Sequence, residues 1–351
     1  MMRLPAFRYR APRTIDDAVA WLAEDPAGTM ILAGGTDLLP NMKRRQQVPA
    51  TLVGLRGVRG ELTEIRNGNG LTIGAGVTLS SVVAAPRVRV SYAGLWQAAA
   101  QVATPHLRNM GTIGGNLCLD TRCTYYDQTY EWRKSIDFCM KKDGGTCWVA
   151  TSSPKCLAVS STDTAPMLQA LGATVTLVSA RGTRVLPVSE LYTNDGIRYL
   201  TKQPDEILTS IALPPSDGVR SCYWKLRRRG SFDFPVAAAA VAARLDGRRV
   251  VEARIVLGAV ASRPVEAERA EALLAGEDDL SDDLIATVAT AASEVAKPMD
   301  NTDFELVWRK KMVRTLVANA LHEIRGDDVR ARRRQLARQE LLSIRPVDTN
   351  G

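Results

Sequence analysis

The cysteines are the residues whose placement most strongly suggests chemistry in this sequence. Five of the six fall between positions 118 and 156, and only Cys222 lies outside that segment. In a reducing compartment, thiols crowded in this way are more typical of metal ligation than of disulfides. The segment therefore predicts a metal centre, and its ligands must be sought among these cysteines.

A second candidate site is the run Ala33-Gly34-Gly35-Thr36-Asp37-Leu38, which continues a short apolar stretch. Paired glycines at the end of a strand expose backbone N–H groups, and without Cβ atoms they let a phosphate approach closely. The Thr36 hydroxyl adds a further donor. An ordinary strand-to-helix turn would explain the same residues. The run matches neither the G-x-G-x-x-G dinucleotide fingerprint nor a P-loop.

The run Thr112-Ile113-Gly114-Gly115-Asn116 repeats this logic, with adjacent glycines between a hydroxyl and an amide side chain. One such loop is weak evidence for a ligand. Two loops in one domain can clamp a pyrophosphate from both sides, as a dinucleotide requires. The pair therefore predicts a flavin or nicotinamide dinucleotide, held by backbone donors of the four glycines with help from Thr36 and Thr112.

Several elements must position these residues. Residues 14–24 have the spacing of an amphipathic helix capped by Thr14, and apolar strands are expected at 30–33 and 51–55. A hairpin is expected within 61–77 and a largely helical stretch at 79–103. Strand character resumes at 173–178.

The stretch Pro214-Pro215-Ser216-Asp217-Gly218 is the best linker candidate. After it we predict three strands, at 221–227, 236–244 and 251–260. Three helices are predicted to follow, at 265–274, 281–296 and 303–325. Strands followed by helices favour a separate α+β domain. We therefore predict four segments, namely lobes at 1–55 and 56–215, a C-terminal domain at 219–326 and a basic tail at 327–351.

The composition narrows the partners. The net charge is +8, with basic clusters at 227–229 and 330–334. Such clusters can mark nucleic-acid binding, but aromatic residues make up only 5% of the chain, and we predict no nucleic-acid partner. No apolar run is long enough to span a membrane, and the first residues lack the pattern of a secretory signal. We expect a cytoplasmic protein.

The two glycine runs, the second taken as 108–117, resemble the FAD-pyrophosphate loops of the flavin subunits of molybdenum hydroxylases, such as carbon monoxide dehydrogenase medium subunits and xanthine dehydrogenase flavin domains. Residues 74–78 are similar to the intervening strand and turn, and 257–264 to the C-terminal domain signature. The resemblance implies an α+β fold. A two-lobed FAD-binding domain of the vanillyl-alcohol-oxidase/PCMH type would precede a C-terminal α+β domain, a three-stranded sheet with helices.

Residues 119–157 depart from the family pattern and are interpreted as an inserted iron–sulfur loop in the second lobe. Cys118 precedes the insertion at a position where family members often carry Cys, so we expect it to be a small buried residue rather than a ligand. The remaining ligand candidates, at separations of 16, 8 and 9 residues, are Cys123, Cys139, Cys147 and Cys156. Four thiolates suit a cubane cluster. Structural zinc, which usually presents Cys-x-x-Cys pairs, and free or disulfide-bonded cysteines remain alternatives.

The insertion resembles that of the beta subunit in the 4-hydroxybenzoyl-CoA reductase subfamily, which carries an extra [4Fe–4S] cluster. This resemblance implies FAD and that cluster as cofactors and a ferredoxin as electron donor. It also implies a small subunit with two [2Fe–2S] clusters and a large molybdenum-cofactor subunit, assembled as a dimer of heterotrimers. Electrons would run from ferredoxin through cluster and FAD to the small subunit and then to molybdenum. In the wider family they run the other way.

Asp163 and Lys225 resemble family residues near the flavin ring. A carboxylate could accept hydrogen bonds from ring N–H groups and a cation could tune the reduction potential, while a capping or surface charge explains each equally simply. The sequence offers no Ser-His-Asp set, carboxylate pair or histidine pair for substrate chemistry. We therefore predict an electron-transfer subunit whose partner carries out the substrate reaction.

Two other functions remain. The first is the FAD subunit of an oxidising enzyme of the xanthine or carbon monoxide dehydrogenase kind, passing electrons to NAD or a quinone. The second is a zinc-stabilised binding module whose glycine runs are only turns. A flavin spectrum in the purified protein and its iron content would separate the three hypotheses.

Overall fold

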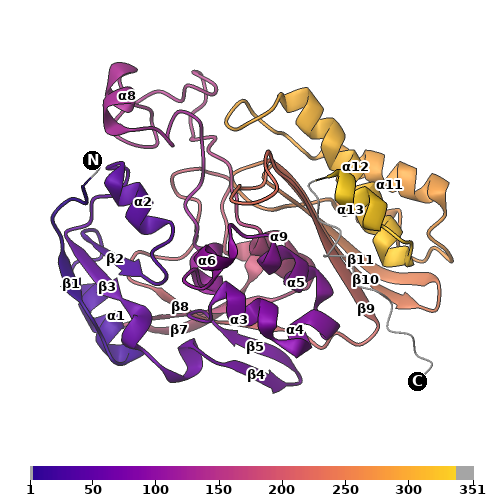
Figure 1. The fold of residues 1–351 in the computed structure, drawn as a ribbon, viewed down its shortest axis with the longest axis horizontal. Helices are drawn as coiled ribbons and strands as arrows, with labels where there is room; N and C mark the ends of the chain where they lie inside the picture. The colour runs from indigo at the N-terminus through magenta and orange to yellow at the C-terminus, as the bar shows by residue number, and fades with distance from the viewer. Residues whose placement is uncertain (1–2, 337–351) are drawn as a thin grey trace.

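The computed structural model describes residues 3–336, which form three sheets with helices packed around them (Figure 1). The first sheet is parallel, in the order β1-β3-β2, from β1 (Arg8–Arg10), β3 (Thr51–Gly54) and β2 (Thr29–Leu32). Helix α1 (Ile15–Glu24) begins where the Thr14 side chain accepts a hydrogen bond from the Asp17 N–H, and it buries its apolar face. This is the small α/β lobe that the sequence predicts.

The second sheet is antiparallel and has five strands. In spatial order they are β4 (Ile65–Gly68), β5 (Gly70–Gly74), β8 (Ile207–Leu213), β6 (Thr174–Ser179) and β7 (Gly182–Pro187). The predicted hairpin is the pair β4–β5, which turns at Gly70, where φ is +112°. In β6 every second side chain is buried, so one face of this sheet contributes to the core.

The stretch 79–103, predicted to be largely helical, divides into α3 (Leu79–Ala84), α4 (Pro86–Ser91) and α5 (Ala93–Ala100). Pro86 begins α4 because proline suits the first turn of a helix and pushes the preceding residue out of helical geometry. The short helices that follow are α6 (Pro105–Arg108), α7 (Ile113–Leu117), α8 (Tyr130–Ser135) and α9 (Thr164–Ala170). Helix α2 (Leu38–Lys43) starts at the first glycine run.

The third sheet has the order β12-β11-β10-β9, from β9 (Val219–Leu226), β10 (Ala237–Asp246), β11 (Arg249–Gly258) and β12 (Val265–Glu266). The three predicted strands are present. The fourth strand lies where a helix was predicted at 265–274, and the helix there, α10 (Glu268–Ala272), is correspondingly shorter. Two residues are too few to show a strand period.

Both faces of this third sheet are buried. Alternate residues of β10 belong to different cores, with Ala238 and Ala240 packed in the core of the first two lobes and Ala239 and Val241 in the C-terminal core. Helices α11 (Asp282–Glu294) and α12 (Leu306–Arg325) cover the face of the third sheet that packs in the C-terminal core. Burial on both sides explains why the β10 sequence reads as an uninterrupted apolar run.

The first residues of the predicted basic tail, 327–336, pack against the C-terminal domain. Residues Arg330–Gln335 form α13, in which Arg333 is fully buried, donates to Glu323 at 2.5 Å and lies 4.2 Å from the Trp224 ring. A partly buried acid and an aromatic face hold a charge that composition alone assigns to solvent. Residues 337–351 lie outside the described part of the chain.

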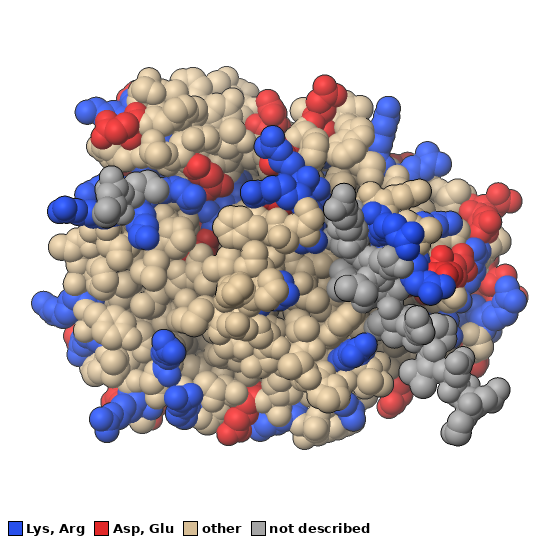
Figure 2. All heavy atoms as spheres, viewed as in Figure 1, with Lys and Arg blue, Asp and Glu red and all other residues tan. Residues whose placement is uncertain are grey.

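Basic and acidic side chains are interspersed over the face shown in Figure 2, with no continuous basic stripe on it. Within residues 3–336, no helix combines the length and the apolar character needed to cross a bilayer.

Candidate functional site

A cavity of about 760 Å³ lies among the two lobes and the start of the C-terminal domain. Its size falls in the range of sites for cofactors. The sequence-predicted residues that line it are Ala33, Gly34, Gly35, Thr36, Asp37, Leu38, Thr112, Gly114, Gly115, Asn116 and Asp163. The cavity thus brings together every predicted flavin-binding residue except Lys225. Lys225 does not line the cavity but contacts Asp163, which does.

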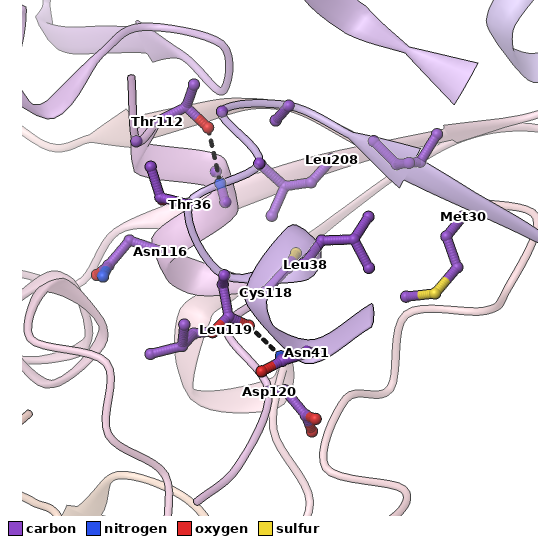
Figure 3. A pocket seen from close by; sticks show the side chains of 18 of the residues that line it. Met30, Thr36, Leu38, Asn41, Thr112, Asn116, Cys118, Leu119, Asp120 and Leu208 are labelled. Atoms are coloured by element: carbon purple, nitrogen blue, oxygen red, sulfur yellow. Dashed lines mark hydrogen bonds between the residues drawn. The ribbon is translucent and has the colours of Figure 1, made fainter. Parts of the chain in front are cut away.

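Polar and apolar linings are divided in space. Thr36, Thr112 and Asn116 gather at one end of the view in Figure 3, and Met30 and Leu208 lie toward the other. A dinucleotide has the same division, because its diphosphate needs donors and its ring systems need apolar walls.

The first glycine run forms a turn with free donors. Gly35 has φ of +71°, the left-handed region that glycine adopts without strain. No hydrogen bond among the described residues uses the backbone N–H of Gly34, Gly35 or Thr36. Successive N–H groups around a left-handed residue form a concavity that binds anions. This run therefore fits the diphosphate of a dinucleotide.

The second run differs from the prediction. The Gly114 N–H donates to the Ala75 carbonyl at 2.9 Å, and the Gly115 N–H donates to the Thr112 hydroxyl at 3.0 Å. These two donors are already used inside the chain, so their predicted role as backbone donors to the ligand does not match the structure. The groups that remain are the Thr112 hydroxyl proton and the Asn116 side-chain NH₂, since the Asn116 oxygen accepts from Thr164 at 2.6 Å.

The glycines also serve a different purpose from the predicted one. A Cβ atom on Gly34 would overlap the Met110 carbonyl, and one on Gly114 would lie 2.6 Å from the Ala75 Cβ. The missing side chain of Gly34 thus lets the first run pack against the second, and that of Gly114 lets the second run pack against Ala75. Gly115 is less confined, because its Cβ would meet only the Thr112 hydroxyl, at 3.0 Å.

We expect Gly34→Ala to release bound flavin and to lower stability by about 1–3 kcal/mol, as overpacking does, because the added methyl forces the two glycine runs apart. Gly68→Ala is the matched control, since a Cβ there meets nothing within 4 Å. Flavin absorbance per chain and thermal unfolding measure both effects. Equal flavin content in the two variants would contradict the role assigned to this packing.

Asp163 and Lys225 form a buried ion pair at the cavity wall. The Lys225 Nζ lies 2.9 Å from Asp163 Oδ1 and donates to the Gln101 carbonyl at 3.1 Å, and the Tyr223 hydroxyl donates to Asp163 at 2.9 Å. Burial raises the pKa of Asp163, which the Lys225 charge opposes, and burial lowers the pKa of Lys225. Both carboxylate oxygens already have partners within the chain. Neither residue is a surface charge, and the Asp163 side chain makes no capping hydrogen bond although Asp163 stands at the N-cap position of α9.

Several lining residues were missed by sequence reasoning. Arg122 forms an ion pair with Asp37 of the first glycine run, lies 3.1 Å from Asp127 and stacks 4.7 Å from the Phe234 ring. Its position just before a candidate ligand cysteine was the available signal. Tyr199 and Phe234 carry no local signal, because both reach the cavity from distant parts of the chain.

The four predicted ligand cysteines are buried and free. Cys123, Cys139 and Cys156 pack in one cluster, and Cys147 is close enough to Cys156 for the charge of one to raise the pKa of the other. Burial raises the pKa of Cys123 to about 12 and that of Cys156 to about 11. The Ala158 N–H donates to the Cys156 sulfur at 3.4 Å, a contact that also occurs at cluster thiolates.

Four buried thiols and an N–H donor to sulfur form a donor set that fits an iron–sulfur cluster. Between residues 3 and 336, no three or more His, Cys, Asp or Glu side chains stand together as the ligands of a single metal ion would. Cys118 is separate from the four, because it lines the flavin cavity, and Cys222 lies in the C-terminal core.

The insertion is fastened at its base. Arg122 and Val159 exchange backbone hydrogen bonds of 2.8 and 2.7 Å, so its two ends are paired. Helix α8 (Tyr130–Ser135) lies far from the sheets, at the upper left of Figure 1. Its buried Arg133 donates to the Arg44 carbonyl at 3.0 Å, and Asn301 of the C-terminal domain donates to the Leu157 carbonyl at 2.5 Å. The insertion thus contacts both the first lobe and the C-terminal domain.

The cavity, its two glycine runs and the surrounding domains define a dinucleotide-binding flavoprotein. Family models specify it further. Residues 5–216 match the FAD binding domain in molybdopterin dehydrogenase, and residues 221–324 match the CO dehydrogenase flavoprotein C-terminal domain. The chain belongs to the family of FAD-binding medium subunits of molybdenum hydroxylases. It is an oxidoreductase subunit, and the predicted α+β fold is confirmed. The interpretation as a zinc-stabilised binding module is wrong.

The similarity to known relatives extends over nearly the whole chain. The FAD-binding subunit of an aldehyde oxidoreductase from Escherichia coli is 31% identical, over 90% of this chain and 99% of its own. The carbon monoxide dehydrogenase medium chain of Afipia carboxidovorans is 29% identical, over 92% and 97%. Among solved structures, a Cu,Mo-CO dehydrogenase superposes with a TM-score of 0.75 at 28% identity, covering 93% of this chain and 99% of that one.

Proposed function

We propose that this chain is the FAD- and [4Fe–4S]-containing electron-transfer subunit of a molybdenum hydroxylase-family reductase of the 4-hydroxybenzoyl-CoA reductase type. The observation that carries the proposal is the set of four buried cysteines in an insertion fastened to the wall of the flavin cavity. When bound, FAD couples one- and two-electron transfer and the cluster transfers single electrons.

The chain's own residues bind and orient these groups. The free N–H groups of Gly34, Gly35 and Thr36, with the Thr112 hydroxyl and the Asn116 amide, supply donors for the diphosphate. The cluster ligands are Cys123, Cys139, Cys147 and Cys156. Arg122 joins the two sites, since it forms an ion pair with Asp37 and directly precedes Cys123.

The proposed partners are a small subunit with two [2Fe–2S] clusters and a large molybdenum-cofactor subunit, in a dimer of heterotrimers that accepts electrons from ferredoxin in the cytoplasm. The relatives named medium chains support an assembly of several subunits. The resemblance of the insertion supports ferredoxin as donor. No described cluster of residues in this chain offers substrate chemistry of its own, which is consistent with a reaction on the large subunit.

The choice of electron donor tests this function. In the anaerobically purified complex, we expect a reduced ferredoxin to bleach the flavin absorbance within the mixing time of the experiment and NADH to leave it unchanged. Bleaching by NADH alone would support the alternative.

That alternative is the FAD subunit of an oxidising enzyme that passes electrons to NAD or a quinone. The similarity to aldehyde oxidoreductase and carbon monoxide dehydrogenase subunits favours it. The four buried cysteines have no role in it, and they are the reason for preferring the reductase.

A further inference from the structure

A buried lysine lies between the cysteines and the flavin cavity. The Lys141 side chain is 6% exposed, and its Nζ donates to Asp120 Oδ1 at 2.8 Å, to the Thr121 hydroxyl at 2.7 Å and to the Gly196 carbonyl at 2.6 Å. Each proton of the ammonium group therefore has an acceptor. The rings of Tyr126 and Tyr199 lie 4.8 and 5.4 Å from the same nitrogen.

The acceptors of Lys141 face two different sites. Asp120 and Tyr199 line the flavin cavity, and Asp120 Oδ2 also accepts from the Tyr126 hydroxyl at 2.9 Å. Gly196 lies against the cysteines, since its N–H donates to the Cys156 carbonyl at 2.9 Å and a Cβ on it would come within 2.7 Å of the Cys156 sulfur. One ammonium group thus connects the cavity wall to the cysteine cluster.

The charge of Lys141 acts on the sulfur side. The ammonium group reaches this side through the Gly196 carbonyl, and Gly196 packs against the Cys156 sulfur. Asp120 carries the compensating negative charge on the cavity side. Reduction adds one negative charge to an iron–sulfur cluster, so a nearby cation favours the reduced form and a nearby anion disfavours it.

We propose that Lys141 is a positioning residue that ties the cysteine-bearing insertion to the flavin cavity and whose positive charge raises the reduction potential of the group bound by the four cysteines. The electrostatic part rests on the proposed function, because it requires a cluster. The positioning part requires only the hydrogen bonds to Asp120, Thr121 and Gly196.

Two substitutions that change the local charge in opposite directions separate an electrostatic role of Lys141 from a purely structural one. Lys141→Met removes the cation, and Asp120→Asn removes the anion while keeping the side-chain shape. In a dithionite titration of the anaerobic full-length protein, followed by electron paramagnetic resonance, we expect Lys141→Met to lower the ratio of reduced to oxidised cluster at a fixed potential by about tenfold. Asp120→Asn should raise that ratio. A purely structural role would shift both variants in the same direction.

Lys142→Met is the matched control, because Lys142 is the adjacent lysine, is 35% exposed and pairs with Asp143 at the surface. It should leave the ratio unchanged. Limited proteolysis measures positioning independently of iron, and Lys141→Met should be cleaved within 119–157 at least several times faster than Lys142→Met.

The outcomes distinguish the two proposals. If the wild-type protein binds iron but Lys141→Met matches Lys142→Met in titration and proteolysis, the inference about Lys141 is overturned and the proposed function stands. If the wild-type protein binds no iron, the proposed function and the electrostatic role both fall. In that case, faster cleavage of Lys141→Met than of Lys142→Met would still support the positioning role of Lys141. Equal cleavage of the two variants would overturn the positioning role as well.

Discussion

Cys139→Ser is expected to empty the cluster site of the anaerobically purified protein while FAD stays bound. The wild-type chain should contain about four irons, as a cubane requires, and the variant close to none. The physical reason is that a serine hydroxyl is a much poorer iron ligand than a thiolate, and the insertion offers no spare cysteine nearby. The same loss is expected for substitutions at Cys123, Cys147 and Cys156. Iron analysis and visible absorbance measure the loss.

Cys118→Ser is the control, because Cys118 lines the flavin cavity and is not in the cluster of Cys123, Cys139 and Cys156. It should keep its iron. One zinc per chain in the wild-type protein would show that the metal has been wrongly identified. If Cys118 proved essential and Cys123 dispensable, the ligand set would be wrong.

Lys225→Met should lower the free energy of unfolding by about 3–5 kcal/mol, the usual effect of leaving one member of a buried ion pair without its partner. Lys225 is fully buried, and its loss leaves the Tyr223 hydroxyl as the one hydrogen-bond partner of the Asp163 carboxylate among the described side chains. Urea unfolding, monitored by circular dichroism, measures the change.

The double variant Asp163→Asn/Lys225→Met tests whether the pair is the cause. It should recover much of the lost stability, because a neutral amide can still accept from Tyr223. Arg248→Met provides a surface comparison, since Arg248 pairs with Asp279 but is 77% exposed, and should leave the urea midpoint almost unchanged. Additive effects of the two buried substitutions would refute the coupling.

Local signals in the sequence predicted much of the fold. Thr14 marks the start of α1, the Asn69–Gly70 turn marks the β4–β5 hairpin, and the apolar run of β10 marks a strand buried on both faces. Both glycine runs line one cavity, as their predicted role as ligand-binding loops requires. These signals work because each depends on a few neighbouring residues.

The details of the site depend on residues far apart in the chain and could not be predicted. The Gly114 N–H is occupied by Ala75, which lies in the turn after β5, and no local pattern reveals that bond. Asp163 and Lys225 were both expected near the flavin, but their pairing requires α9 and β9 to meet. Arg333 appeared to belong to a solvated tail because its partners Glu323 and Trp224 are visible only in three dimensions.

The paired ends of the insertion make it a closed loop on the flavin-binding body. Arg122 and Val159 are hydrogen-bonded at its base. The insertion therefore costs the folding of the rest of the chain a loop-closure entropy, which grows slowly with loop length. The insertion's own apolar core is small, being centred on three of the cysteines with Tyr126 and Ala158. Metal binding and folding of such a segment are one equilibrium. If the insertion holds the proposed cluster, removing its iron should unfold the insertion before the flavin-binding body unfolds.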